Sequence, residues 1–184
     1  MRVESNPFAR GTQAVDFDLI DTVSDQMISL QDVKGENGTV VMFICNHCPF
    51  VIHVNEELVR LANDYSSQGI GFVAINSNDV NYVPQDGPEF MKKHAKATGY
   101  PFPYLYDETQ EVARAYDAAC TPDLYVFDKE LKSVYHGQLD DSRPGNTAPV
   151  NGWAVREVLD ALIRGEEYSG EEKPSIGCNI KWKK

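Results

Sequence analysis

The chain has 184 residues, of which 42% are hydrophobic and 24% are charged, and its formal net charge is −11. A chain of this length buries about 70% of its unfolded surface, so it folds without a disulfide framework, and its four cysteines are judged one by one. The acidic surface disfavours nucleic acid as a partner, and no run reaches the roughly 18 apolar residues of a membrane span.

The first predicted elements are three strands. Residues 15–20 alternate apolar and acidic side chains, which is typical of a half-buried strand, and residues 27–30 are its expected hairpin partner. Residues 39–44 form a continuous apolar, β-branched run. Such a run predicts a buried central strand, covered on both faces.

Two helices and another strand are predicted next. Pro49 suits the first turn of a helix, because its missing N–H costs nothing there, and Gly69 closes that helix. A buried strand over residues 70–75 follows. Pro88 then opens a helix that ends near Gly99, a residue typical of helix C-termini.

The remaining elements continue the alternation. Asp107 and Gln110 have the spacing of a capping box, which predicts a helix that runs to about Asp117. The other predicted elements are strands over 104–106, 124–127 and 133–135, a polar loop over 140–151, a helix over 153–163 and a tail over 165–184. Strands that alternate with helices indicate a single α/β domain over residues 1–184, with a central mixed sheet.

A Cys-x-x-Cys motif stands where the strand over 39–44 turns into a helix. Cys45 is expected beside the helix N-terminus, where unpaired N–H groups and the helix dipole favour an anion. That environment lowers a thiol pKa and makes Cys45 the expected nucleophile, with Cys48 as the resolving cysteine. A loop at a strand end is normally exposed, so we expect both sulfurs to be accessible.

His47 lies inside the motif and has two interpretations. A protonated histidine would stabilise the neighbouring thiolate, whereas a solvated loop histidine would have no tuning role. Metal binding is the main rival hypothesis for the motif, because Cys45, His47, Cys48 and His53 are close in sequence. No second ligand pair follows at zinc-site spacing, so we predict no metal and no other cofactor.

Two further cysteines remain open. Cys120 directly precedes Thr121 and is either a third redox thiol or a small buried residue, with core packing the favoured interpretation. Cys178 in the tail is either an auxiliary resolving cysteine or an inert packed thiol, and the inert role is favoured.

The strand that ends in the cysteine motif, together with Thr121-Pro122 much later, resembles the thioredoxin superfamily. The resemblance implies a thioredoxin-like fold with an N-terminal β-hairpin and a C-terminal tail. It also implies a cis Thr121–Pro122 bond that packs on the cysteine pair, and a Thr121 backbone that is offered to the substrate. The opening residues 15–19 and the long insert over 78–99 resemble the redoxin branch, which includes the alkyl hydroperoxide reductase/thiol-specific antioxidant proteins. Residues 45–51 resemble a small group within it that shares the string CNHCP.

One departure from that branch bears on activity. Peroxiredoxins carry Pro-x-x-x-Thr-x-x-Cys, but Met42 stands where the threonine before Cys45 would be, and Gly38 where the proline would be. A peroxiredoxin-like thiol peroxidase with antioxidant activity therefore stays an alternative, and a metal-delivery module is a further one.

The sequence thus predicts a cytoplasmic thiol–disulfide oxidoreductase. Residues 1–14 are polar and lack the apolar core of a secretory signal. The expected partners are protein or small-molecule disulfides and a thiol reductant, with no nucleic acid and no membrane. The predicted site comprises Cys45 and Cys48 as reacting cysteines, supported by His47, Cys120, Thr121 and Pro122.

Overall fold

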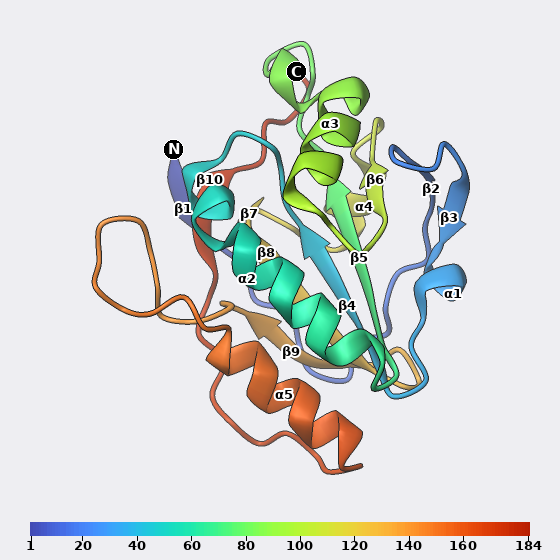
Figure 1. Ribbon diagram of the computed structural model, residues 1–184, viewed down its shortest axis with the longest axis vertical. Helices are drawn as coiled ribbons and strands as arrows, with labels where there is room; N and C mark the ends of the chain where they lie inside the picture. Colours follow the sequence, from blue (N-terminus) through green and yellow to red (C-terminus); the bar gives the residue numbers. More distant parts are fainter.

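The computed structural model describes residues 1–184 and is built around a seven-stranded mixed sheet (Figure 1). Its strands are β2 (Asp18–Asp21), β3 (Met27–Ser29), β4 (Gly38–Phe43), β5 (Ile70–Asn76), β6 (Tyr104–Tyr106), β8 (Asp123–Asp128) and β9 (Ser133–Gly137). They are ordered β3-β2-β6-β5-β4-β8-β9. The middle strands β6, β5 and β4 are parallel, whereas the outer strands at both edges pair antiparallel.

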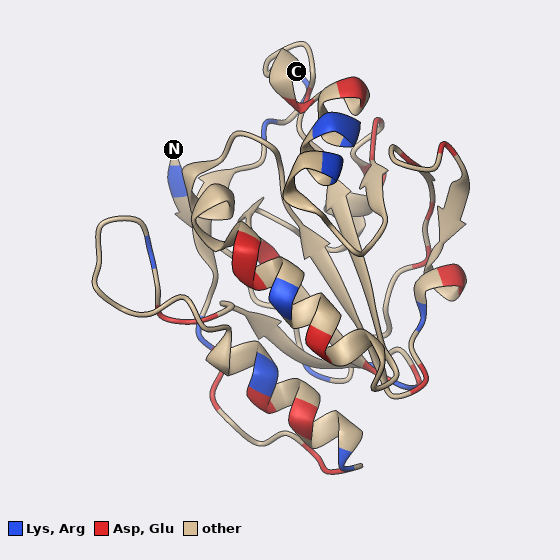
Figure 2. Cartoon of the chain, viewed as in Figure 1, with Lys and Arg blue, Asp and Glu red and all other residues tan.

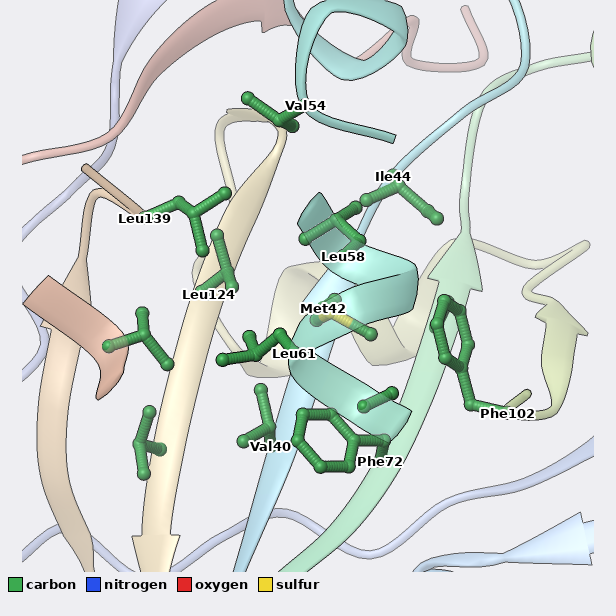
Figure 3. Close-up of a cluster of buried hydrophobic side chains, with 14 of the residues drawn as sticks. Val40, Met42, Ile44, Val54, Leu58, Leu61, Phe72, Phe102, Leu124 and Leu139 are labelled. Atoms are coloured by element: carbon green, nitrogen blue, oxygen red, sulfur yellow. The ribbon is translucent and has the colours of Figure 1, made fainter. Parts of the chain in front are cut away.

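The central strand β4 is buried along its whole length. Successive side chains of a strand point to opposite faces of the sheet. Val40 and Met42 accordingly enter one hydrophobic cluster, and Val41 and Phe43 enter another. Figure 3 shows the first cluster, in which Met42 lies beside Leu58, and Val40 beside Leu61, of helix α2 (Pro49–Ser66). A continuous apolar run is therefore needed in β4, because neither of its faces meets water.

Helices cover both faces of the sheet. Side chains of α2, α3 (Pro88–Thr98) and α5 (Trp153–Ile163) contribute to the first cluster. Side chains of α1 (Leu30–Val33) and α4 (Glu111–Ala115) contribute to the second. In Figure 1, α2 and α5 lie side by side in front of the strands. None of the helices combines the length and apolar character that crossing a bilayer requires.

A buried carboxylate joins α2 to α5. Glu57 is only 2% exposed and accepts hydrogen bonds from Arg60 Nε and Arg156 Nη2, each at 2.7 Å. Acidic and basic residues are mixed along both helices (Figure 2), which places the arginine partners of Glu57 within reach. A buried charge needs such partners, since its desolvation is costly when it is left alone.

The two ends of the chain form a second sheet of three strands, β1 (Arg2–Glu4), β7 (Cys120–Thr121) and β10 (Ile176–Asn179). β10 lies between the other two and pairs antiparallel with both. Beyond the ladder, Ile180 N–H donates to Ala119 O at 3.0 Å. The tail over residues 165–184 therefore does more than wrap the body: it adds a strand beside Thr121.

Most predicted elements are confirmed, including the α/β class, the mixed sheet, the hairpin and the helices that begin at Pro49 and Pro88. The predicted capping box is wrong. Gln110 is the N-cap of α4 and makes no side-chain cap, because its amide donates to Ser77 O and Lys181 O. The Asp107 carboxylate instead accepts the N–H of Ala113 at 2.9 Å, so the helix is shorter than predicted.

We expect Gly177→Ala to loosen the tail strand. A Cβ at this position would overlap the carbonyl oxygen of Thr121 and would lie 2.6 Å from its carbonyl carbon, so β10 must move away from β7. Such overpacking costs about 1–3 kcal/mol of stability. Hydrogen exchange at the Ile180 amide should accelerate, and thermal unfolding should start at a lower temperature.

The matched control is Gly99→Ala, where no atom lies within 4 Å of the added Cβ but φ is +77°. It should cost about 1 kcal/mol for the left-handed backbone and leave tail exchange unchanged. Equal Ile180 exchange rates in Gly177→Ala and the unsubstituted protein would contradict the argument.

Candidate active site

The Cys45–Cys48 segment connects β4 to α2, as the sequence predicts. The β-ladder extends one residue past β4, where Ile44 N–H donates to Ile75 O at 3.0 Å. α2 then begins at Pro49, and Cys48 is its N-cap. The start of the helix therefore lies at Cys48, whereas the sequence analysis placed Cys45 beside it.

Thr121 contacts both sulfurs of the pair. Cys45 Sγ lies 3.4 Å from Thr121 Oγ1, and Cys48 Sγ lies 3.4 Å from the Thr121 carbonyl oxygen, to which it is positioned to donate. The Thr121–Pro122 peptide bond is cis, which confirms that prediction. All four cysteines are present as free thiols.

The cysteine pair is buried, so the expected exposure of the loop is wrong. Cys45 is 1% exposed and Cys48 is 0% exposed. Two segments that are distant in sequence cover the loop: Thr121-Pro122, and β10, whose Cys178 contacts Cys48. The groups nearest the two sulfurs include a hydroxyl, a carbonyl and a third thiol, so this cover is partly polar.

Thr121 also differs from what the resemblance implies. Its backbone was expected to be offered to a substrate, but in the structure Thr121 pairs with Cys178 of the chain's own tail. The position next to Pro122 is therefore already occupied by a strand.

Cys45 and Cys48 ionise as a unit. A side-chain hydrogen bond from the Cys45 thiol lowers the pKa of Cys48 to about 5, and Cys178 adds to that shift. The same interaction raises the pKa of Cys45 well above its usual value, and burial and the charge of Asp86 add to that shift. Cys48 is therefore the more acidic of the two thiols, whereas the sequence predicted a lowered pKa for Cys45.

Asp86 is a member of the site that the sequence analysis missed. It lies in the short 3₁₀ turn η1 (Pro84–Asp86), is fully buried, and accepts Asn46 N–H at 2.8 Å and Asn78 Nδ2–H at 2.8 Å. His47 Nδ1 lies 2.8 Å from its second oxygen. The sequence carried no local signal for this role, because residues 84–88 read only as a loop before a helix.

The structure brings three possible metal ligands together. Donor atoms of Cys45, His47 and Asp86 all lie within 4.8 Å of one another. His53 does not join them, since its Nε2 lies 2.7 Å from Ser142 Oγ. His47 Nδ1 lies 2.8 Å from Asp86 Oδ2, within ion-pair distance, but the contact lacks hydrogen-bond geometry, and this buried nitrogen has no hydrogen-bond partner.

The other two cysteines differ in their surroundings. Cys120 is fully buried, its sulfur lies 3.9 Å from Pro122 O, and burial raises its thiol pKa far above the usual value. This environment fits the core-packing role. Cys178 is half-buried on β10 and packs against the cluster that contains Cys45 and Cys48.

Comparisons with known proteins agree with this geometry. Residues 10–136 match the AhpC/TSA family. The chain is 26% identical over 133 residues to the thiol-disulfide oxidoreductase ResA of Halalkalibacterium halodurans, and this alignment covers 71% of the chain and 70% of the relative.

Two solved structures are similar over most of their length. An uncharacterised conserved protein from Geobacillus kaustophilus has a TM-score of 0.98 at 62% identity, covering 100% of this chain and 97% of that one. The thioredoxin domain of a thiol-disulfide oxidoreductase from Bacteroides vulgatus has a TM-score of 0.64 at 18% identity, covering 83% of this chain and 99% of that one. The second likeness shows that the fold is thioredoxin-like.

We expect Asp86→Asn to destabilise the protein. An amide of the same shape brings an NH₂ group to a place where Asn46 and Asn78 already supply donors, so a buried donor loses its partner. Such a loss costs about 1–3 kcal/mol, measured by urea unfolding. The control Asp25→Asn removes one exposed ion pair with Lys92 and should change stability by less than about 1 kcal/mol. Equal effects of the two substitutions would argue against the role of Asp86.

The lowered pKa of Cys48 predicts an acidic thiolate. Because the pKa is about 5, the reduced protein carries the thiolate at neutral pH and loses it as the pH falls through about 5. The ultraviolet absorbance of the thiolate should fall as the pH decreases through about 5. This transition should be absent in Cys48→Ser and unchanged in Cys120→Ser. Absorbance that appears only above about pH 8, as for a free thiol, would show that Cys48 is not the acidic thiol described.

Proposed function

The chain belongs to the AhpC/TSA family, and from this premise we propose that it is a thiol–disulfide oxidoreductase whose reacting sulfurs are those of Cys45 and Cys48. One observation carries the proposal: the two sulfurs lie together at the start of α2 against Thr121, 3.4 Å from its hydroxyl and 3.4 Å from its carbonyl oxygen. A thiolate paired with a thiol is the form of a cysteine pair that reacts with disulfides.

The pair reduces a substrate disulfide in two exchanges. In the first, Cys45 Sγ attacks one substrate sulfur, the substrate S–S bond breaks, and the Cys45 proton passes to Cys48 Sγ. In the second, Cys48 Sγ attacks Cys45 Sγ and expels the substrate sulfur that is bonded to Cys45. That substrate sulfur takes the proton from Cys48. The substrate gains two electrons, one proton from the pair and one from solvent, and the protein is left with a Cys45–Cys48 disulfide.

The ionisation order supports Cys45 as the sulfur that bonds to the partner. In the reverse reaction, a thiol that attacks the Cys45–Cys48 disulfide expels the better leaving group, which is the low-pKa sulfur of Cys48. The mixed disulfide then forms on Cys45. Forward and reverse exchange follow the same path, so the substrate disulfide also engages Cys45.

The surroundings of the pair agree with this order. Cys45 is followed by the half-buried Asn46 and His47, whereas Cys48 is held between the helix start, Thr121 and the tail strand. Because Cys45 is buried as well, a substrate must displace part of the cover before it reacts. We propose disulfides of proteins or small molecules as substrates, and a cytoplasmic thiol as the reductant that regenerates the pair.

Peroxide reduction is supported less well by the site. Met42 occupies the threonine position of the peroxiredoxin loop and is fully buried in β4, so it supplies no hydroxyl beside Cys45. Thr121 Oγ1 does lie next to Cys45 Sγ, which is the one feature that favours a peroxidatic role. Consumption of hydrogen peroxide therefore belongs in the same assay series.

The test is reduction of insulin and of a small model disulfide by the reduced protein. We expect Cys45→Ser and Cys48→Ser each to lower the rate to that of the uncatalysed exchange, because each removes one of the two reacting sulfurs. Cys48→Ser should also accumulate a mixed disulfide on Cys45, seen by mass spectrometry.

Cys120→Ser is the matched control for loss of a buried thiol beside the site. The proposal is overturned if the unsubstituted protein reduces insulin and the model disulfide no faster than the two serine variants do. Rapid peroxide consumption with a sulfenate trapped on Cys45 would favour the peroxidase instead.

A further inference from the structure

The tail strand places a third sulfur against the cysteine pair. In β10, Cys178 is directly opposite Thr121 of β7. Directly paired residues of antiparallel strands project their side chains to the same face of the sheet. Cys178 therefore lies on the same face as the Thr121 hydroxyl, which contacts Cys45, while the adjacent Cys120 projects to the other face.

Cys178 and Cys48 are close enough to influence each other. Cys178 packs against the hydrophobic cluster that contains Cys48, it lowers the pKa of Cys48, and Cys48 helps to raise the pKa of Cys178 to about 11. Gly177 lets the strand come this close, because a side chain there would overlap Thr121. Cys178 is half-buried, whereas Cys45, Cys48 and Cys120 are almost completely enclosed.

We propose that Cys178 is a third redox thiol, which replaces Cys45 in the disulfide with Cys48. The resulting Cys48–Cys178 bond includes the more exposed sulfur of Cys178. This inference rests on the proposed function, which supplies the Cys45–Cys48 disulfide by reducing a substrate disulfide. The inference adds Cys178 as the sulfur that a thiol reductant attacks.

The exchange is balanced within the chain. Cys178 Sγ attacks Cys48 Sγ, the Cys45–Cys48 bond breaks, and the Cys178 proton is transferred to Cys45, so no electrons enter or leave. A reductant thiolate then attacks Cys178 and expels Cys48 as a thiolate. A second reductant thiolate then attacks the sulfur of the bound reductant and expels Cys178, which takes up a proton, and this leaves three reduced cysteines and one reductant disulfide.

The position of Cys178 sets the first exchange, which expels the less acidic Cys45, whereas the acidity of Cys48 favours the second exchange. Cys48 is the best leaving group in the site because its pKa is about 5, and it is expelled when Cys178 is attacked. Cys178 is also the thiol that solvent reaches most easily. The matched family region ends at residue 136, so the tail strand is an addition to that region.

The test maps disulfides in protein equilibrated with mixtures of reduced and oxidised glutathione, quenched with acid, alkylated and digested for mass spectrometry. In the unsubstituted protein we expect both Cys45–Cys48 and Cys48–Cys178 linked peptides. Cys45→Ser should retain the Cys48–Cys178 link as its internal disulfide. Cys178→Ser should lose that link and keep the Cys45–Cys48 disulfide.

Cys120→Ser is the control, and its Cys48–Cys178 link should be unchanged. A Cys45→Ser protein that holds glutathione on Cys48 while Cys178 is alkylated would overturn the relay. An unsubstituted protein with the Cys45–Cys48 disulfide and no Cys48–Cys178 peptide would overturn it too, and would leave the proposed function intact. Absence of both disulfides at every glutathione ratio would overturn the proposed function itself.

Discussion

The Cys48 sulfur is buried at the start of α2, and its low pKa depends on two other parts of the chain. The Cys45 thiol lowers the pKa of Cys48 most strongly, and Cys178 in the tail lowers it further. A buried thiolate without such partners would take up a proton. The tail strand and the pair are therefore linked energetically, because moving β10 away removes the effect of Cys178 on Cys48.

The negative groups around the pair decide where its proton resides. Asp86 is buried beside Cys45 and raises the pKa of that thiol, so a second negative charge is disfavoured there. Asp86 itself accepts hydrogen bonds from Asn46 and Asn78, which explains how a fully buried carboxylate is tolerated. The charge of Asp86 thus helps to make the two cysteines unequal, although the motif is nearly symmetric in sequence.

The second sheet changes how the thioredoxin-like site can be used. A strand that pairs with Thr121 occupies the place where a substrate backbone was expected, and it brings its own cysteine there. The two chain ends reinforce this arrangement, since β1 pairs with the other side of β10. The same short strand therefore covers the cysteine pair and carries Cys178.

The sequence by itself determined the features that depend on neighbouring residues. The apolar run of β4, Pro49 at the first turn of α2, and the cysteine spacing between them indicated the fold class and the candidate cysteine pair, because each pattern acts within a few residues. Only the tertiary structure decided that Asp86 lies against His47, that Cys178 lies against Cys48, and that the pair is buried. These contacts join segments far apart in the chain, and short polar stretches such as residues 84–86 and 176–179 carry no periodicity that would reveal their partners.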